Sequence, residues 1–271
     1  MKRSVGVYLI RVLLVLFGMG LFFFSSCGLE TYYYLDPPNV EHEPIYSSSD
    51  PLQFYFSFRT KEDGDNNTDQ GTFKFLGTYI YYKIYNSYTE MKTREDAVST
   101  LNSSTNYTAA ADKIISSYEY QVLGFSAVSY DPDPTIESSG SSRYVYIRLN
   151  DYGDEEAYKA SICVGSELLS SYDSNYAVKL ADGTVVVPKR KDGANVKHGF
   201  NFNSADSSSD ENPVPVSGDP DVYLNTSASS EGTWYVDMYA ISVGQDESLS
   251  KSYSQVAFLG SVAIYESDYE D

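Results

Sequence analysis

Alternation of apolar and polar side chains over five long stretches constrains the fold of this chain more than any other feature of its sequence. Successive side chains of a β-strand point to opposite faces of the sheet, so the alternation predicts strands with at least one buried face. Glycine, proline and serine separate the stretches, as expected for turns. We therefore predict a mainly β fold. The five stretches are residues 52–59, 73–85, 143–149, 233–243 and 253–265.

The spacing within a stretch also predicts which side chains share a face. In residues 52–59, every second residue from Leu52 to Phe58 is expected on one apolar face. In residues 253–265, the same spacing places Val256, Phe258, Val262 and Ile264 together, with Gly260 between them. Shorter candidate strands are residues 118–124, 125–130, 157–164 and 184–188.

Two short helices are expected in the segment that follows residue 85. Thr93, Arg94, Glu95 and Asp96 fit a capping box at the start of a helix, and Ala97, Val98 and Leu101 would form its apolar face. Residues 109–117 are the second candidate helix. Both would be insertions in a chain that otherwise consists of strands and turns.

The first 26 residues have the pattern of an export signal. Lys2 and Arg3 give a positive start, and the apolar residues 12–24 follow. That apolar run has 13 residues, whereas a helix needs about 20 to cross a bilayer. Two alternatives stay open: an uncleaved anchor, and an ordinary secretory signal with an incidental cysteine.

The residues that end this segment are Phe24, Ser25, Ser26 and Cys27. They resemble the lipobox of bacterial lipoproteins, with Phe24 where leucine is usual. The resemblance implies that signal peptidase II removes residues 1–26 and that Cys27 carries the acyl chains. Gly28 stands where aspartate would resemble an inner-membrane retention signal, which favours the outer membrane. The implied location is the cell envelope, on either the periplasmic or the surface side.

The mature chain divides into a tether and a folded region. Proline pairs and a serine run over residues 27–50 predict an extended tether after the lipidated Cys27. Residues 51–271 then form one β-sandwich domain with insertions. Two small β-domains are the alternative.

Charge and cysteine content exclude several classes of partner. Without residues 1–26, 16 basic residues face 38 acidic ones, a formal net charge of −22. Nucleic acid is therefore excluded as a partner, because its binding needs a basic surface. The membrane is contacted through the lipid anchor. Cys163 has only the lipidated Cys27 as a second cysteine and is expected to pack as a small apolar residue. No cofactor is implied.

Two of the strands resemble those of fibronectin type III-like and wider immunoglobulin-like domains. Residues 78–85 are similar to the third strand of that fold, and residues 234–244, rich in aromatic residues and ending near a glycine, are similar to the sixth. The resemblance implies an antiparallel β-sandwich. The gaps between strands exceed those of a module of about 100 residues. We therefore expect long insertions, including one or two short helices and an irregular region around 165–219.

One loop has the spacing of a calcium site at its start but not further along. An EF-hand loop needs glycine at its sixth position and glutamate at its twelfth, whereas this chain has Thr68 and Lys74 there. A polar turn between strands is the favoured interpretation, and no metal is assigned. The candidate ligands at alternate positions are Asp63, Asp65, Asn67 and Asp69.

Tyrosines form stripes on the strand faces opposite the aliphatic side chains. Such rings could stack on sugars or anchor a protein partner. The alternative, which we favour, is that they pack under the inserted helices or pair across strands. The candidates are Tyr79, Tyr81, Tyr85, Tyr144 and Tyr146.

These observations predict a membrane-anchored envelope lipoprotein whose folded part is a non-enzymatic binding or structural module. A protein or a glycan would be its ligand. The alternative is an envelope hydrolase that acts on a glycan through paired carboxylates. Two carboxyl groups facing each other across a groove would favour this alternative.

Overall fold

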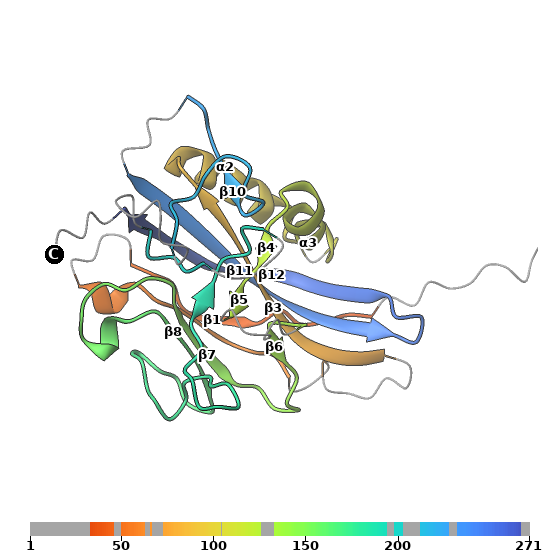
Figure 1. Cartoon of the computed structure of the whole chain (residues 1–271). Coiled ribbons are helices and arrows are strands. Elements are labelled where there is room, and N and C mark those ends of the chain that lie inside the picture. Colours follow the sequence, from red (N-terminus) through yellow and green to blue (C-terminus); the bar gives the residue numbers. More distant parts are fainter. Residues whose placement is uncertain are drawn as a thin grey trace, which may run out of the picture. The chain divides into compact units, whose positions relative to one another are not determined.

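The computed structural model describes residues 33–45, 50–62, 66, 73–103, 105–125, 133–193, 198–202, 212–227 and 232–266. Within it, Tyr34–Asp271 forms one compact unit. Figure 1 shows the helices and strands of this unit.

Two sheets make up most of the unit. The four-stranded sheet is antiparallel and has the order β1 (Asn39–His42), β2 (Phe56–Arg59), β7 (Tyr144–Arg148) and β8 (Ser161–Gly165). The larger sheet has the order β10 (Val222–Tyr223), β3 (Phe73–Tyr85), β11 (Thr233–Asp246) and β12 (Lys251–Tyr265). Within it β3, β11 and β12 are antiparallel, and β10 is parallel to β3.

Short elements complete the fold. The strands β4 (Gln121–Val122) and β6 (Ile136–Glu137) pair with β3, and β5 (Gly124–Phe125) pairs with β9 (Pro188–Lys189). The helices are α2 (Tyr88–Leu101) and α3 (Ala109–Asp112), which continues into a π-helical turn, η3 (Lys113–Ser117). The 3₁₀ turns η1 (Pro51–Gln53) and η4 (Glu156–Tyr158) precede β2 and β8.

The two sheets pack face to face, so the predicted mainly β sandwich is confirmed. Side chains from both inner faces form one apolar core, which makes the unit a sandwich in the usual sense. The smaller sheet contributes Phe56, Phe58, Val145, Ile147 and Ile162, and the larger sheet contributes Ile80, Tyr82, Ile84, Val236, Met238, Leu259, Val262 and Ile264.

The outer face of the larger sheet is buried beneath the helices (Figure 1). Met91 and Val98 of α2, with Ala110 and Ala111 of α3, pack on side chains of β3 and β11. A sheet covered on both faces needs apolar side chains at successive positions. This explains why β3 and β11 contain long runs of buried residues instead of a simple alternation.

The strand order agrees with the implied immunoglobulin-like pattern in one sheet and departs from it in the other. The order β3–β11–β12 is that of the third, sixth and seventh strands of such domains. In the smaller sheet, β8 lies outside β7 and follows it in the chain. In the immunoglobulin pattern the outer strand comes before its neighbour. The strands of the smaller sheet are therefore connected in a different chain order from those of an immunoglobulin-like domain.

The compact unit begins before residue 51, the boundary predicted between tether and folded region. It begins at Tyr34, and β1 pairs with β2 in the smaller sheet. This strand escapes prediction because it has only four residues, NVEH, three of them exposed, and lies between prolines. The predicted strand 52–59 is also shorter, because Pro51–Gln53 forms a 3₁₀ turn before β2.

The predicted start of the first helix is wrong by one and a half turns. The helix α2 begins at Tyr88, and the Ser87 side chain accepts a hydrogen bond from the backbone N–H of Glu90 at 3.4 Å. Thr93 lies inside the helix, where its Oγ1 donates to the carbonyl of Thr89. The second helix, predicted over residues 109–117, is confirmed as α3 and its π-helical turn.

The single apolar face predicted for the last strand is also wrong. Two consecutive residues of β11 pair with Phe258 and Gly260 of β12, so Leu259 is an extra residue, a β-bulge. An added residue moves every later side chain to the other face. Val256 and Phe258 therefore pack under the helices, whereas Val262 and Ile264 pack between the sheets.

Candidate functional site

Two of the predicted sites lie outside the described residues. These are the lipidation residue Cys27 and the candidate calcium ligands Asp63, Asp65, Asn67 and Asp69. Within the same loop Asn66 is described and buried, and its side chain bonds the backbone of Asp36 and Lys61. In the part of the chain that the structure describes, no group of three or more histidine, cysteine, aspartate or glutamate side chains is arranged to hold a metal ion.

The predicted tyrosine stripes are packed inside the unit. Tyr79, Tyr81 and Tyr85 are at most 6% exposed and lie in the cluster beneath α2 and α3. Tyr146 is 1% exposed and packs with Tyr55, Cys163 and Ala177 on the outer side of the smaller sheet. Tyr144 is half-buried beside Arg59. The four buried rings therefore pack inside the unit, which is the alternative that we favoured, and they cannot stack on a ligand at the surface.

A hydrogen-bonded chain of three side chains lies under the helices. The hydroxyl of Tyr120 bonds the Tyr85 hydroxyl at 2.7 Å and donates to Oδ2 of Asp237 at 2.6 Å. Asp237 is fully buried, and this burial raises the pKa of its carboxyl group to about 8. The neighbouring Lys83 donates to the carbonyls of Glu119 and Pro220, and burial lowers its pKa.

A carboxyl group with a strongly shifted pKa in a cleft would indicate a catalytic site. Asp237, however, is not in a cleft. It has no exposed surface and faces the helix layer from the middle of β11. The hydrolase alternative requires two carboxyl groups across a groove. Asp219 and Asp221 both accept hydrogen bonds from Arg190, so these two carboxyl groups share a cation and do not face each other across a groove.

Arg190 joins the irregular region to the larger sheet. Its guanidinium group is fully buried and binds Asp221 through two hydrogen bonds of 3.0 Å. It also donates to Asp219 at 2.9 Å and to the carbonyl of Pro213. Asp221 accepts a further hydrogen bond of 2.7 Å from Tyr82 of β3. A charge pair satisfied on all sides in this way is structural, and it holds the segments around residues 190 and 213–221 in place.

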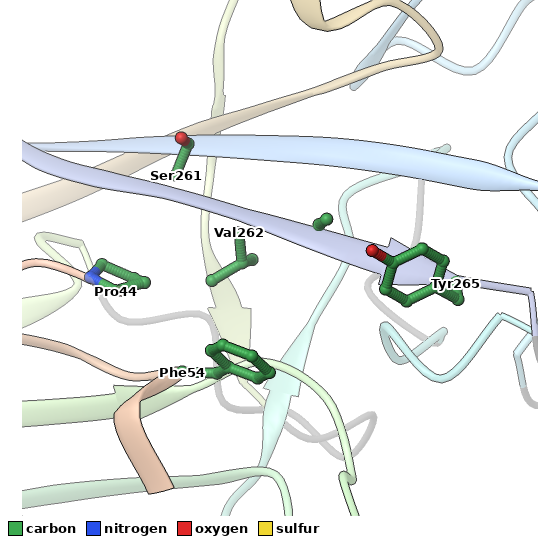
Figure 2. Close-up of a pocket in the computed structure, with 6 residues that line it drawn as sticks. Pro44, Phe54, Ser261, Val262 and Tyr265 are labelled. Carbon is green, nitrogen blue, oxygen red and sulfur yellow. The ribbon is translucent and has the colours of Figure 1, made fainter. Parts of the chain in front are cut away.

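The strongest candidate for a binding surface lies at the open side of the sandwich. Figure 2 shows Pro44 and Phe54 on one side of a groove and residues of β12 on the other. The groove has a volume of about 290 Å³, which includes space open to solvent. Its lining is mostly apolar. The residues of this edge groove are Pro44, Phe54, Ser261, Val262, Ala263 and Tyr265.

The groove runs beside the end of an edge strand. Among the described residues, β12 pairs only with β11. Its other edge is covered at two points: the side-chain amide of Asn102 bonds both the N–H and the C=O of Val256, and Pro44 lies against Gly260. Beyond Gly260, the stretch 261–265 pairs with β11 on one edge and has no strand partner on the other edge in the described part of the chain. Unpaired strand edges are templates for pairing with another polypeptide.

Exposed apolar and acidic side chains surround the edge groove. Tyr265 is 62% exposed and Ile45 is 44% exposed. Glu43 is exposed and precedes Pro44, and the half-buried Glu266 follows Tyr265 and accepts a hydrogen bond from Trp234. The groove therefore has an apolar floor and a negatively charged rim.

Sequence reasoning misses this groove because its two walls are far apart in the chain. Pro44 lies in the predicted tether, and Phe54 and Tyr265 are more than 200 residues apart. Nothing in the local pattern of either segment indicates that they meet. The available signal was the exposed end of the last predicted strand, which needed a partner or a cover.

Comparison with known proteins adds no assignment to this geometry. Among the described residues, no helix has the length and apolar character needed to span a membrane. No family model matches the chain, and neither a curated protein nor a solved structure matches it.

Proposed function

We propose that the chain is a cell-envelope lipoprotein anchored through Cys27, whose sandwich binds an extended segment of a partner protein at the edge groove. The anchor is supported by the signal pattern of residues 1–26 and the small residues before Cys27. The binding role is supported by one observation above the others. In the described residues, the outer edge of the stretch 261–265 of β12 has no strand partner, and it lies beside an apolar groove with exposed Tyr265 at its end.

The chemistry of the edge groove indicates which kind of polypeptide segment would fit it. An added strand would form hydrogen bonds with the backbone groups on the outer edge of residues 261–265, the edge that faces away from β11. The groove would hold one of the apolar side chains of that strand. Carboxylates at Glu43 and Glu266 favour a segment that carries lysine or arginine beside that apolar residue. The formal net charge of −22 for the chain without residues 1–26 (16 basic and 38 acidic residues) also favours a positively charged partner.

A protein segment suits the edge groove better than a glycan does. Sites for small molecules usually have volumes of about 300–1,000 Å³ and enclose most of the ligand. The groove is at the lower end of that range and open to solvent, so one side chain fills it. The rings that could have stacked on sugars, Tyr79, Tyr81 and Tyr85, are buried.

Photo-crosslinking in cells tests the binding role. A benzoylphenylalanine at Tyr265 should give a discrete protein adduct, whereas the same residue at Leu168, which is 55% exposed on another loop, should not. Ala263→Phe fills the groove without changing the charge and should abolish the adduct at Tyr265. Equal adducts at both positions, or an adduct that survives Ala263→Phe in a folded protein, would contradict binding at the edge groove.

The anchor needs a separate experiment. Intact mass and membrane fractionation of the native protein should show a mature chain that begins at acylated Cys27 and sediments with membranes. Cys27→Ala should lose both the acyl mass and the membrane association. A variant that stays membrane-bound with residues 1–26 attached would show that the apolar segment is itself the anchor. Protease added to whole cells would report whether the sandwich faces outside.

The hydrolase alternative stays a hypothesis without a site among the described residues. Its carboxylates would have to face each other across a groove. None of the described acidic residues lines the edge groove; Glu43 and Glu266 only adjoin its lining residues Pro44 and Tyr265 in the chain.

A further inference from the structure

The folded unit begins abruptly at Tyr34. Leu35 is 2% exposed, and the next residue, Asp36, is fixed by two hydrogen bonds to the buried Asn66. The Asp36 N–H donates to the Asn66 side chain at 2.8 Å, and the Asn66 amide donates back to the Asp36 carbonyl at 3.0 Å. Tyr34 is therefore held on the body of the sandwich at a defined place.

The chain between the anchor and this place is short. From Cys27 to Tyr34 are seven residues, which reach at most about 25 Å when fully extended. A folded unit of about 240 residues has a radius of gyration of about 18 Å, and so a diameter well above that reach. A tether shorter than the body that it holds keeps one end of that body close to the membrane.

Two tyrosines occupy the surface at that place. Tyr34 is 41% exposed, and its ring meets the Tyr107 ring edge-on, with 4.5 Å between the ring centroids. Leu101, 37% exposed, lies at the end of α2, just before the turn that leads to Tyr107. Tyrosine is enriched at membrane–water interfaces, where the ring meets the acyl boundary and the hydroxyl stays hydrated.

We propose that the surface formed by Tyr34 and Tyr107 rests on the lipid headgroups and fixes the orientation of the sandwich on the membrane. This inference rests on the lipid anchor at Cys27. The acidic chain is repelled by anionic headgroups. The contact is therefore made by aromatic rings on zwitterionic lipid.

This orientation directs the edge groove away from the membrane. From Asn39 the chain runs along β1 to Pro44, which lies against Gly260 of β12. The strand β12 then continues from Gly260 to its last residue, Tyr265. Tyr34 lies before the start of β1, and the groove lies beyond the end of that strand. A partner would reach the groove from the side opposite the bilayer.

Depth-dependent fluorescence quenching tests the orientation. The acylated protein is reconstituted in phosphatidylcholine vesicles with a fraction of doxyl-labelled lipid. Tyr107→Trp adds a fluorophore at the proposed contact, and Tyr265→Trp adds one at the opposite end as the matched control. The native Trp234 is 4% exposed and gives a constant background that the parent protein measures. Quenching of the added emission should be severalfold stronger at position 107 than at 265.

The outcomes separate the orientation from the anchor. Equal quenching at both positions, or stronger quenching at 265, in acylated protein that floats with the vesicles would overturn the orientation alone. Protein without acyl mass that does not float would overturn the anchor, and the orientation with it. If Tyr107→Trp fails to fold, Leu101→Trp reports on the same end, with the same expected and contradicting results.

Discussion

A single buried carboxyl group makes the stability of the sandwich depend on pH. Asp237 lies under the helices, where burial raises the pKa of its carboxyl group from 3.8 to about 8. The hydrogen bond from Tyr120 opposes this shift and does not reverse it. Its second oxygen, Oδ1, has no hydrogen-bond partner among the described residues. The folded chain therefore keeps a proton on Asp237 that the unfolded chain releases above about pH 4.

The sign of this effect is the reverse of ordinary acid unfolding. Because the folded state binds the extra proton, the contribution of Asp237 is most favourable below its unfolded pKa and is lost as the pH rises from about 4 to about 8. Asp237→Asn keeps an oxygen that accepts from Tyr120 and removes the charge. We expect this variant to be more stable than the parent at pH 8, by on the order of 2 kcal/mol or more, since one pKa unit corresponds to about 1.4 kcal/mol.

Urea unfolding of both proteins at pH 5 and pH 8 measures the difference. The gain from Asp237→Asn should shrink as the pH is lowered. Asp246→Asn is the control, because hydrogen bonds from the Ser248 side chain and neighbouring backbone lower the pKa of that exposed carboxyl group. Asp246→Asn should give no gain at pH 8. If the free energies of unfolding of the parent and of Asp237→Asn change equally with pH, the raised pKa of Asp237 is contradicted.

At the level of elements, the bounds of the long strands were predictable. The bounds of most short strands and the start of the helix α2 were not. The pattern predicts β3 with the same bounds that the structure has, and β11 and β12 within a few residues, because 13 to 15 residues of apolar and β-favouring side chains give a strong signal. Among the two-residue strands, β4 lies within the predicted strand 118–124, whereas β6 and β10 lie in segments for which no strand is predicted. In α2 the residues from Thr93 imitate a capping box, but Ser87 precedes Glu90 with the same spacing and lies where β3 ends.

The contact between α2 and the edge of β12 depends on one side chain. Asn102, the C-cap of α2, accepts from the Val256 N–H at 3.0 Å and donates to the Val256 C=O at 2.9 Å. Asn102→Ala leaves two backbone groups without this partner, and we expect a loss of about 1–3 kcal/mol in the free energy of unfolding. Hydrogen exchange of the Val256 amide should accelerate. Asn175→Ala, in an exposed turn, should have little effect, and unchanged exchange at Val256 would refute the role of Asn102.

The Arg190 network should be the strongest single link between the irregular region and the sheet. Arg190→Met leaves the buried Asp221 without its cation, which costs about 3–5 kcal/mol in comparable sites. The control is Lys159→Met, which breaks an ion pair with Asp151 whose lysine is 44% exposed. That change should cost less than about 1 kcal/mol. Similar losses for both variants in urea unfolding would show that the buried pair contributes no more than a surface pair.

At the level of the whole molecule, the candidate site depends on how the two sheets meet. The sandwich was predictable because alternating strands must bury their apolar faces against one another. The edge groove was not, because it needs the exact crossing of residues 43–44 over the bulge of β12. The tyrosine stripes give a similar lesson. An aromatic strand face can be buried or can bind a ligand, and the two are distinguished only by what covers the sheet, which here is the layer of helices.

Gly260 is the residue at which that crossing can be tested. It has a φ of +104°, and a Cβ there would lie 2.8 Å from Cδ of Pro44 and 3.1 Å from Cβ of Glu43. Gly260→Ala therefore combines backbone strain with a clash that pushes Pro44 away from β12. Gly218→Ala is a matched control, because Gly218 has a φ of +108° and nothing within 4 Å of the added Cβ.

The difference between these two variants isolates the crossing from the strain. Both should lose about 1 kcal/mol or more from the positive φ, and Gly260→Ala should lose more because Pro44 must move. Only Gly260→Ala should reduce the crosslinking yield at Tyr265, since Pro44 forms one wall of the edge groove. Urea unfolding and the crosslinking assay measure the two effects separately. If Gly260→Ala and Gly218→Ala behave alike in both assays, Pro44 does not hold the groove open, and the partner must be bound elsewhere on the sandwich.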